Sequence, residues 1–77
     1  MVLEEFYVIT NEEGKYYAHT TIELELEPAF VSNVLMCHRF PSRESVELFM
    51  KGFYGNIHKS VFDKCTIDYI TIEMNKK

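Results

Sequence analysis

Three glutamates at every second position are the most distinctive chemical feature of the chain: Glu23, Glu25 and Glu27. Apolar side chains alternate with them, as expected for a half-buried strand. Residues i and i+2 of a strand lie about 6.8 Å apart on one face, close to the phosphate spacing of a nucleic acid. Such a row of carboxylates could occupy a basic groove of a partner protein. The ordinary alternative is a solvated strand face, whose charge discourages aggregation between sheet edges.

Further acidic residues extend this region if the first part of the chain forms a hairpin. Residues 1–27 hold seven acids and one lysine, whereas residues 28–77 hold seven bases and five acids. Phosphate contacts need clustered Lys or Arg, so the acidic part argues against direct binding of nucleic acid. The sequence predicts five partner-binding residues: Glu23, Glu25, Glu27, Glu12 and Glu13.

Histidine and cysteine side chains are the other groups that could bind a metal. There are five of them: His19, Cys37, His38, His58 and Cys65. Adjacent residues of a strand point to opposite faces, so Cys37 and His38 can hardly share one ion. The cysteines lack CxxC spacing, which favours two reduced, partly buried thiols over a zinc site or a disulfide. We expect no metal and no other cofactor.

Catalytic motifs are absent from the sequence. It contains no GxSxG elbow, no HExxH and no glycine loop for phosphate, and it has only three glycines. Asp63 and Asp68 could form a carboxylate pair, but isolated surface acids are the common case. We therefore predict a protein that is not an enzyme.

Aromatic side chains exceed what a sheet with a single helix can easily cover. Six are in question: Tyr7, Tyr16, Tyr17, Phe30, Tyr54 and Phe62. An exposed aromatic patch is typical of a protein contact surface, and the sequence predicts an interface, for instance of a homodimer, at Tyr7, Tyr17 and Phe30. The competing explanation is that residues 56–64 fold over this patch and cover it.

The first elements that must position these residues are strands. Alternating β-branched and aromatic residues predict a strand over residues 4–10. Residues 11–14 (NEEG) predict a hairpin turn, which Gly14 closes with a positive φ. The second strand begins at Lys15, is clearest over residues 21–27, and should end at Pro28.

The rest of the chain predicts a strand, a helix and a final strand. Residues 29–33 suit a loop, and residues 34–40 suit a third strand. Ser42 can cap a helix whose apolar stripe comprises Val46, Phe49, Met50 and Phe53. Residues 55–56 (GN) suit a helix stop, and residues 57–63 a further turn or two. In the last strand, residues 65–74, the apolar positions change phase, which indicates either two covered faces or a bulge near Tyr69.

These elements predict a single α+β domain over residues 1–77. Its order is β-β-β-α-β, with a small antiparallel or mixed four-stranded sheet and one main helix packed on one face. Residues 1–5 lack the basic start of a secretory signal, and no run approaches the ~20 apolar residues of a membrane span. We therefore expect a cytoplasmic protein without membrane contact.

Two stretches of the sequence resemble small accessory proteins of phages and mobile elements in Gram-positive bacteria. They are residues 7–17 (YVITNEEGKYY), similar to the opening hairpin of these proteins, and residues 40–49 (FPSRESVELF), similar to their strand-to-helix junction. The resemblance implies an anti-defence role, since some small acidic members inhibit host nucleases, including CRISPR effectors, by blocking nucleic-acid-binding or catalytic surfaces. It implies no particular catalytic or binding residue.

The favoured hypothesis is a non-enzymatic protein that binds and inhibits or modulates a basic, nucleic-acid-handling partner such as a host defence nuclease. Its acidic surface would mimic nucleic acid, as in an anti-CRISPR protein. The alternative is a homo-oligomeric phage accessory or adaptor protein that acts through its aromatic face.

Overall fold

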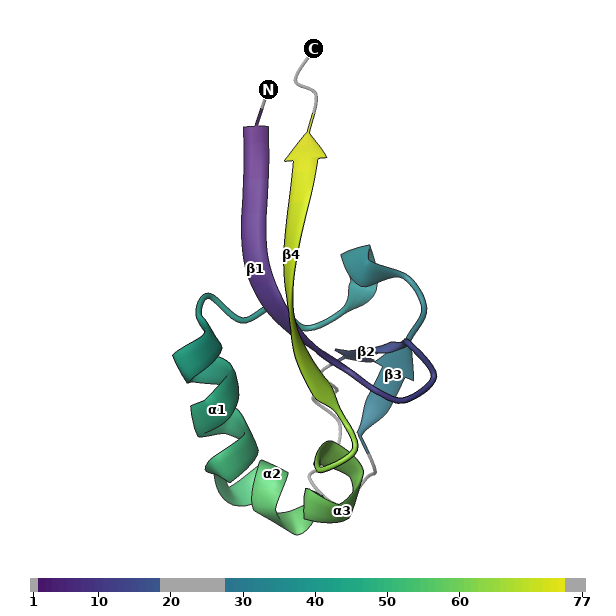
Figure 1. The fold of residues 1–77 in the computed structure, drawn as a ribbon, viewed down its shortest axis with the longest axis vertical. Coiled ribbons are helices and arrows are strands. Elements are labelled where there is room, and N and C mark those ends of the chain that lie inside the picture. Colours follow the sequence, from purple (N-terminus) through teal and green to yellow (C-terminus); the bar gives the residue numbers. More distant parts are fainter. Residues whose placement is uncertain (1, 19–27, 75–77) are drawn as a thin grey trace.

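A computed structural model describes residues 2–18 and 28–74 of the chain (Figure 1). The elements are β1 (Val2–Thr10), β2 (Tyr16–Ala18), β3 (Ala29–Val31), the 3-10 helix η1 (Val34–Met36), α1 (Arg43–Lys51), α2 (Phe53–Ile57), α3 (Lys59–Phe62) and β4 (Thr66–Met74). The strands form one antiparallel sheet in the order β3-β2-β1-β4. This confirms the predicted α+β class. Within the described ranges, no helix combines the length and apolarity needed to cross a membrane.

The turn between β1 and β2 has the predicted chemistry. The side-chain oxygen of Asn11 accepts hydrogen bonds from the backbone N–H groups of Glu13 (3.0 Å) and Lys15 (2.9 Å). Gly14 has a φ of +79°, which an L side chain rarely adopts. Residues 19–27, where the second strand was expected to be clearest, lie outside the described residues.

The predicted third strand is wrong in position. β3 consists of Ala29–Val31, where a loop was expected, and η1 occupies the start of the expected strand. Asn33 causes this change, because its side-chain oxygen accepts a hydrogen bond from the N–H of Leu35 and begins a helical turn. Two strand-like contacts remain in the expected range: the N–H of His38 donates to the carbonyl oxygen of Tyr17 in β2 (2.9 Å), and Phe40 forms an isolated bridge to Tyr7 in β1.

The helical segment begins as predicted but does not end as predicted. Ser42 caps α1 by accepting a hydrogen bond from the N–H of Ser45. The helix ends at Gly52, whereas the expected stop at residues 55–56 lies inside α2. Gly55 is needed there for close packing, since a Cβ would lie only 2.7 Å from the Cα of Met50. The chain continues into α3, which confirms the further turn expected over residues 57–63.

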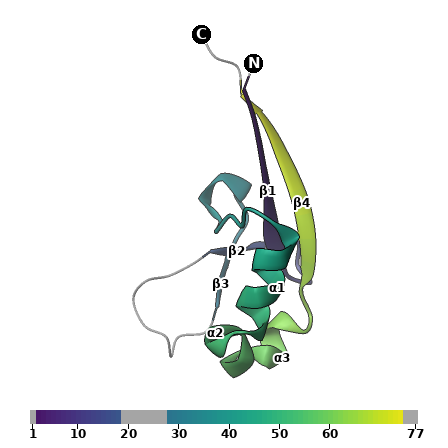
Figure 2. The ribbon, with the colours of Figure 1, turned by 90° about the vertical axis from the view of Figure 1, so that its left-hand side faces the viewer.

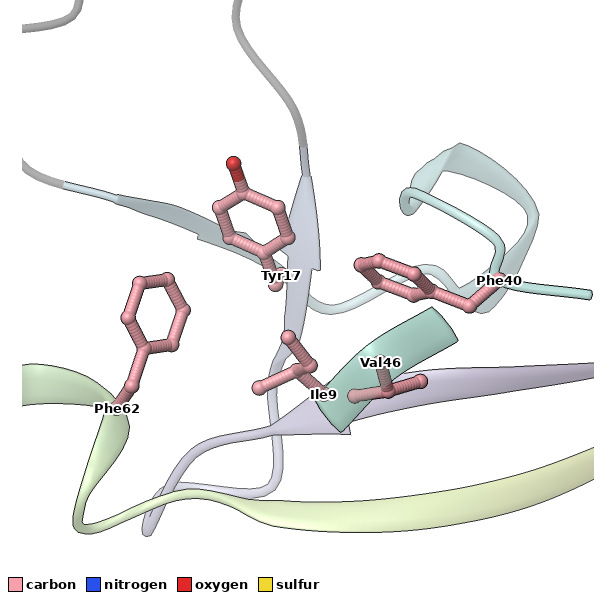
Figure 3. Close-up of a cluster of buried hydrophobic side chains, with 5 residues drawn as sticks. All are labelled: Ile9, Tyr17, Phe40, Val46 and Phe62. Carbon is pink, nitrogen blue, oxygen red and sulfur yellow. The ribbon is translucent and has the colours of Figure 1, made fainter. Parts of the chain in front are cut away.

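Apolar side chains cover both faces of the sheet. On the helix side, one cluster comprises Ile9, Tyr17, Phe40, Val46 and Phe62 (Figure 3). On the opposite face, a second cluster comprises Phe6, Val8 and Cys37. The predicted stripe of α1 joins the first cluster through Val46, Phe49 and Met50, but Phe53 is 74% exposed because the chain turns at Gly52.

Because both faces of the sheet are covered, apolar side chains occur on both faces of β4, which explains the change of phase in its apolar positions. Ile67 packs against the first cluster, whereas Ile70 and Ile72 pack against the second. The register of β1 with β4 runs without interruption from Val2↔Met74 to Thr10↔Thr66. The change of phase is therefore due to two covered faces and not to a bulge.

β1 and β4 extend well beyond the other strands as a two-stranded arm, here defined as residues 2–6 and 70–74 (Figure 1). β1 and β4 pair over nine residues each, whereas β2 and β3 have three residues each. The molecule is therefore elongated, with a long axis of 43 Å. The helices lie at the opposite end from the tip of the arm.

Candidate partner-binding surface

A hollow of about 490 Å³ lies between the β1–β2 turn, β3 and α3. Its lining residues are Asn11, Glu12, Glu13, Phe30, Ser60, Val61 and Lys64. Three of the residues predicted from the sequence therefore come together here, namely two partner-binding glutamates and one aromatic interface residue. This is the surface that best combines the predicted chemistry with a concave shape.

The β1–β2 turn supplies the two carboxylates that line this hollow. Glu12 and Glu13 are both exposed, and the bonds that Asn11 accepts fix the backbone on which they stand. Neither glutamate forms an ion pair within residues 2–18 and 28–74.

The apolar part of the hollow comes from Phe30 in β3 and Val61 in α3. Both are half-buried, and the ring of Phe30 stands edge-on to that of Tyr17 at a centroid distance of 6.2 Å. The fold therefore holds this surface in place through the first core cluster.

Among the lining residues that the structure describes, Lys64 is the only base, against two acids. Its backbone N–H donates to the carbonyl oxygen of Val61, which fixes the chain after α3. The lining keeps a net negative charge. Apolar groups beside carboxylates suit a Lys or Arg side chain, whose stem packs on apolar groups while its head binds the anions.

The acidic strand predicted from the sequence cannot be compared with this hollow. Glu23, Glu25 and Glu27 lie outside the described residues, so their alignment on one face stays a prediction.

The predicted aromatic interface needs correction at Tyr17. This residue is 1% exposed and belongs to the first core cluster, with its ring 5.6 Å from that of Phe62. Burial and a hydrogen bond with Tyr54 raise the pKa of the Tyr17 hydroxyl above its ordinary range. Because Phe62 comes from α3, the competing explanation, that residues 56–64 fold over the aromatic residues, holds for Tyr17.

Tyr7 and Phe30 are only half-buried. Tyr7 packs against its cross-strand neighbour Tyr69, at a centroid distance of 5.1 Å. Tyr69 is itself 52% exposed. Desolvation raises the pKa of its hydroxyl, and a hydrogen bond with Glu5 and the negative charge of that carboxylate raise the pKa further. Tyr7 and Phe30 thus both pack at the margin of the first core cluster, and Phe30 also lines the hollow.

Both cysteines are free thiols with structural contacts. The Sγ of Cys37 donates to the carbonyl oxygen of Val34 (3.0 Å), and that of Cys65 to the carbonyl oxygen of Val61 (3.4 Å). Burial raises the pKa of both thiols, and for Cys65 the nearby Glu12 carboxylate adds to the effect. A raised pKa lowers the thiolate fraction, so neither thiol is an activated nucleophile.

The described histidines pack against aromatic rings. His38 lies 4.5 Å from the ring of Phe40, and His58 lies 4.7 Å from the ring of Tyr54, both measured between centroids. No group of three side chains suited to a metal ion occurs in the described part of the chain. His19, the remaining histidine, lies outside it.

Sequence reasoning missed the contribution of α3 to the hollow. Ser60, Val61 and Lys64 carry no local signal, because only the folding of α3 against the turn brings them beside Glu12 and Glu13. Comparisons with protein-family models, curated proteins and solved structures found no match. The resemblance to phage and mobile-element proteins therefore stays a prediction.

Proposed function

We propose that this protein is a non-enzymatic binding protein that inhibits or modulates a basic, nucleic-acid-handling partner, such as a host defence nuclease in the cytoplasm. The observation that carries the proposal is the pair of exposed carboxylates, Glu12 and Glu13, that line one hollow together with the apolar Phe30 and Val61. A nucleic-acid-binding protein presents Lys and Arg side chains in its groove. Such side chains match both the charged and the apolar part of the hollow.

The glutamate row of the sequence supports the same proposal. Glu23, Glu25 and Glu27 follow β2 in the chain and add three negative charges to the acidic first third of the molecule. A surface of one sign raises the rate of encounter with a partner of opposite charge, and salt weakens this effect. We assign these three glutamates to the partner-binding surface together with Glu12 and Glu13.

The test begins with affinity capture from a lysate of the bacterial host, followed by binding measurements on the captured protein. The expected partner has a basic groove, competes with nucleic acid for that groove, and associates more slowly as salt is added. The variant E12Q/E13Q should bind about tenfold more weakly, since two partner-facing charges together contribute on the order of 1–2 kcal/mol.

A matched control removes the same charge from another surface. The variant E44Q/E47Q alters two exposed residues of α1, one of which, Glu47, faces Arg43 at 3.4 Å. This control should bind as the unmodified protein does. A complex insensitive to salt, or one that keeps its full affinity in E12Q/E13Q, would contradict the role of the hollow.

The glutamate row needs a variant of its own. E23Q/E25Q/E27Q should weaken inhibition of the captured partner and reduce the salt dependence of association. If this variant inhibits fully, mimicry of nucleic acid by the row is wrong, whatever the result for E12Q/E13Q.

The alternative of a homo-oligomeric accessory or adaptor protein with an aromatic face has weaker support. One of its three interface residues, Tyr17, lies in the core. The other two, Tyr7 and Phe30, are half-buried against the same core cluster, so only part of each ring is exposed for a contact. This burial concerns the aromatic face alone and does not bear on oligomerisation through another surface of the molecule.

A further inference from the structure

β4 forms one edge of the sheet along its whole length. In the strand order β3-β2-β1-β4, β1 is its only neighbour among the described strands. Figure 2 shows β4 on the outer side of β1, opposite β2 and β3. Nine residues of backbone are therefore available to a further strand.

The hydrogen bonds of β1 show which residues of β4 face this open edge. The N–H and C=O groups of Tyr7 both bond to Phe40, at 2.8 and 2.9 Å, on the side of β1 away from β4. Because bonding directions alternate along an antiparallel strand, Tyr69, which lies opposite Tyr7, has its own groups turned away from β1. By the same alternation, the backbone groups that face outward belong to Ile67, Tyr69, Thr71 and Glu73.

The edge lacks most of the features by which sheet edges usually avoid pairing, and its only charged side chains between Thr66 and Glu73 are Asp68 and Glu73. Between Thr66 and Glu73 there is no proline, no lysine and no glycine, and the register with β1 contains no bulge. β-Branched and aromatic residues dominate this stretch. Moreover, a two-stranded ribbon is only marginally stable in water. The arm has no third strand beside it in Figure 1, although Phe6, Ile70 and Ile72 at its base pack in the second core cluster.

The sequence of β4 is complementary to itself in one antiparallel register. If Ile70 lies on a two-fold axis opposite its own copy, Tyr69 lies opposite Thr71, Ile67 opposite Glu73, and Asp68 opposite Ile72. All four outward-facing residues then find partners, and each such pair exchanges two hydrogen bonds, which adds about eight. The two acids face isoleucines, so no like charges stand opposite each other.

We propose that two copies of this chain pair through β4, antiparallel and centred on Ile70, to form one continuous eight-stranded sheet. The contact is isologous, as the commonest homodimer contacts are. It converts the two marginal arms into a four-stranded central sheet and leaves the hollow at Glu12 and Glu13 outside the dimer contact. The dimer does not depend on the function proposed above.

Sedimentation of matched variants at position 71 tests the open edge. Thr71 is exposed, and its N–H faces away from β1, so T71P should keep the monomer fold while removing a donor from the dimer. T71A keeps that donor and serves as the control. We expect a dimer for the unmodified chain and for T71A, and a dissociation constant raised about tenfold or more in T71P. A monomer at high micromolar concentration, or an unaffected dimer in T71P, would overturn the proposal.

Disulfide formation tests the register without relying on proline. Tyr69 and Thr71 of opposite copies would have Cα atoms about 5.5 Å apart, which suits a disulfide. Mild oxidation of the double variant Y69C/T71C should therefore give a covalent dimer, whereas Y69C and T71C alone should not. Equal cross-linking in a single variant would contradict the register, and no cross-linking in the double variant would contradict the pairing.

Discussion

Replacing Gly55 by alanine gives a sharp test of how the helices pack. Gly55 is buried in α2, and an added Cβ would lie 2.6 Å from the carbonyl carbon of Met50 and 2.7 Å from its Cα. Ordinary contacts of this kind are 3.4–4 Å. The obstacle is backbone, which cannot rotate away as a side chain can, so α2 must move relative to α1.

The cost of this movement can be estimated from two opposing effects. Overpacking of a core typically costs about 1–3 kcal/mol, and a backbone obstacle places G55A at the upper end. Alanine recovers about 1 kcal/mol, because it favours a helix more than glycine does. The net loss is about 2 kcal/mol, which lowers the melting temperature of a domain of this size by roughly 8–16 °C.

Urea and thermal unfolding followed by circular dichroism would measure this loss, with the other two glycines as controls. A Cβ at Gly52 would meet only the carbonyl oxygens of Leu48 and Phe49, at 3.2 and 3.4 Å, so G52A should change stability by less than about 0.5 kcal/mol. G14A should cost about 1–2 kcal/mol, through its positive φ alone. If G55A is as stable as the unmodified protein, the close approach of α2 to Met50 is wrong.

Three further predictions concern the core, the helix cap and alkaline pH. I9A should lose about 2–5 kcal/mol of unfolding free energy in a urea titration, because Ile9 is fully buried. I57A is the control: the side chain of Ile57 is 51% exposed, so this variant should lose less than about 1 kcal/mol. S42A removes the cap of α1 and should cost about 0.5–2 kcal/mol, which S42D should largely restore. The pKa of the Tyr17 hydroxyl is raised in the folded protein, so Tyr17 keeps its proton in the folded state but loses this proton near pH 10 in the unfolded state. The free energy of unfolding should therefore fall above about pH 10. In Y17F, which has no hydroxyl at this position, the urea midpoint should fall less steeply over the same pH range. Equal slopes for the two proteins would contradict the burial of this hydroxyl.

Local sequence signals predicted those elements whose cause is local. Asn11 and Gly14 define a turn by their own side-chain and backbone chemistry, and Ser42 begins a helix in the same way. Alternation predicted β1, and the Thr-, Ile- and Tyr-rich composition of residues 65–74 predicted β4 although its apolar positions change phase. The class of the fold followed from these elements.

Features that depend on distant contacts were not predictable in the same way. Residues 34–40 have the composition of a strand, but Asn33 caps a helical turn at their start. The strand that pairs with β2 is instead formed by the earlier residues of β3. Gly55 suited a helix stop, and only the approach of Met50 explains its place inside α2. The hollow likewise required α3 to fold beside the β1–β2 turn, so Val61 and Lys64 could not be assigned to it beforehand.

The pairing of Val2 with Met74 has a mechanical consequence. A pulling force applied between these two neighbouring residues would act perpendicular to β1 and β4, at the tip of the arm. This force would break the hydrogen bonds at the tip first and then separate the two strands one residue pair at a time. It would not load all the hydrogen bonds between the strands at once. The molecule should therefore begin to unfold at low force when it is pulled at Val2 and Met74. The two core clusters would be disrupted only after β1 and β4 had separated in the arm.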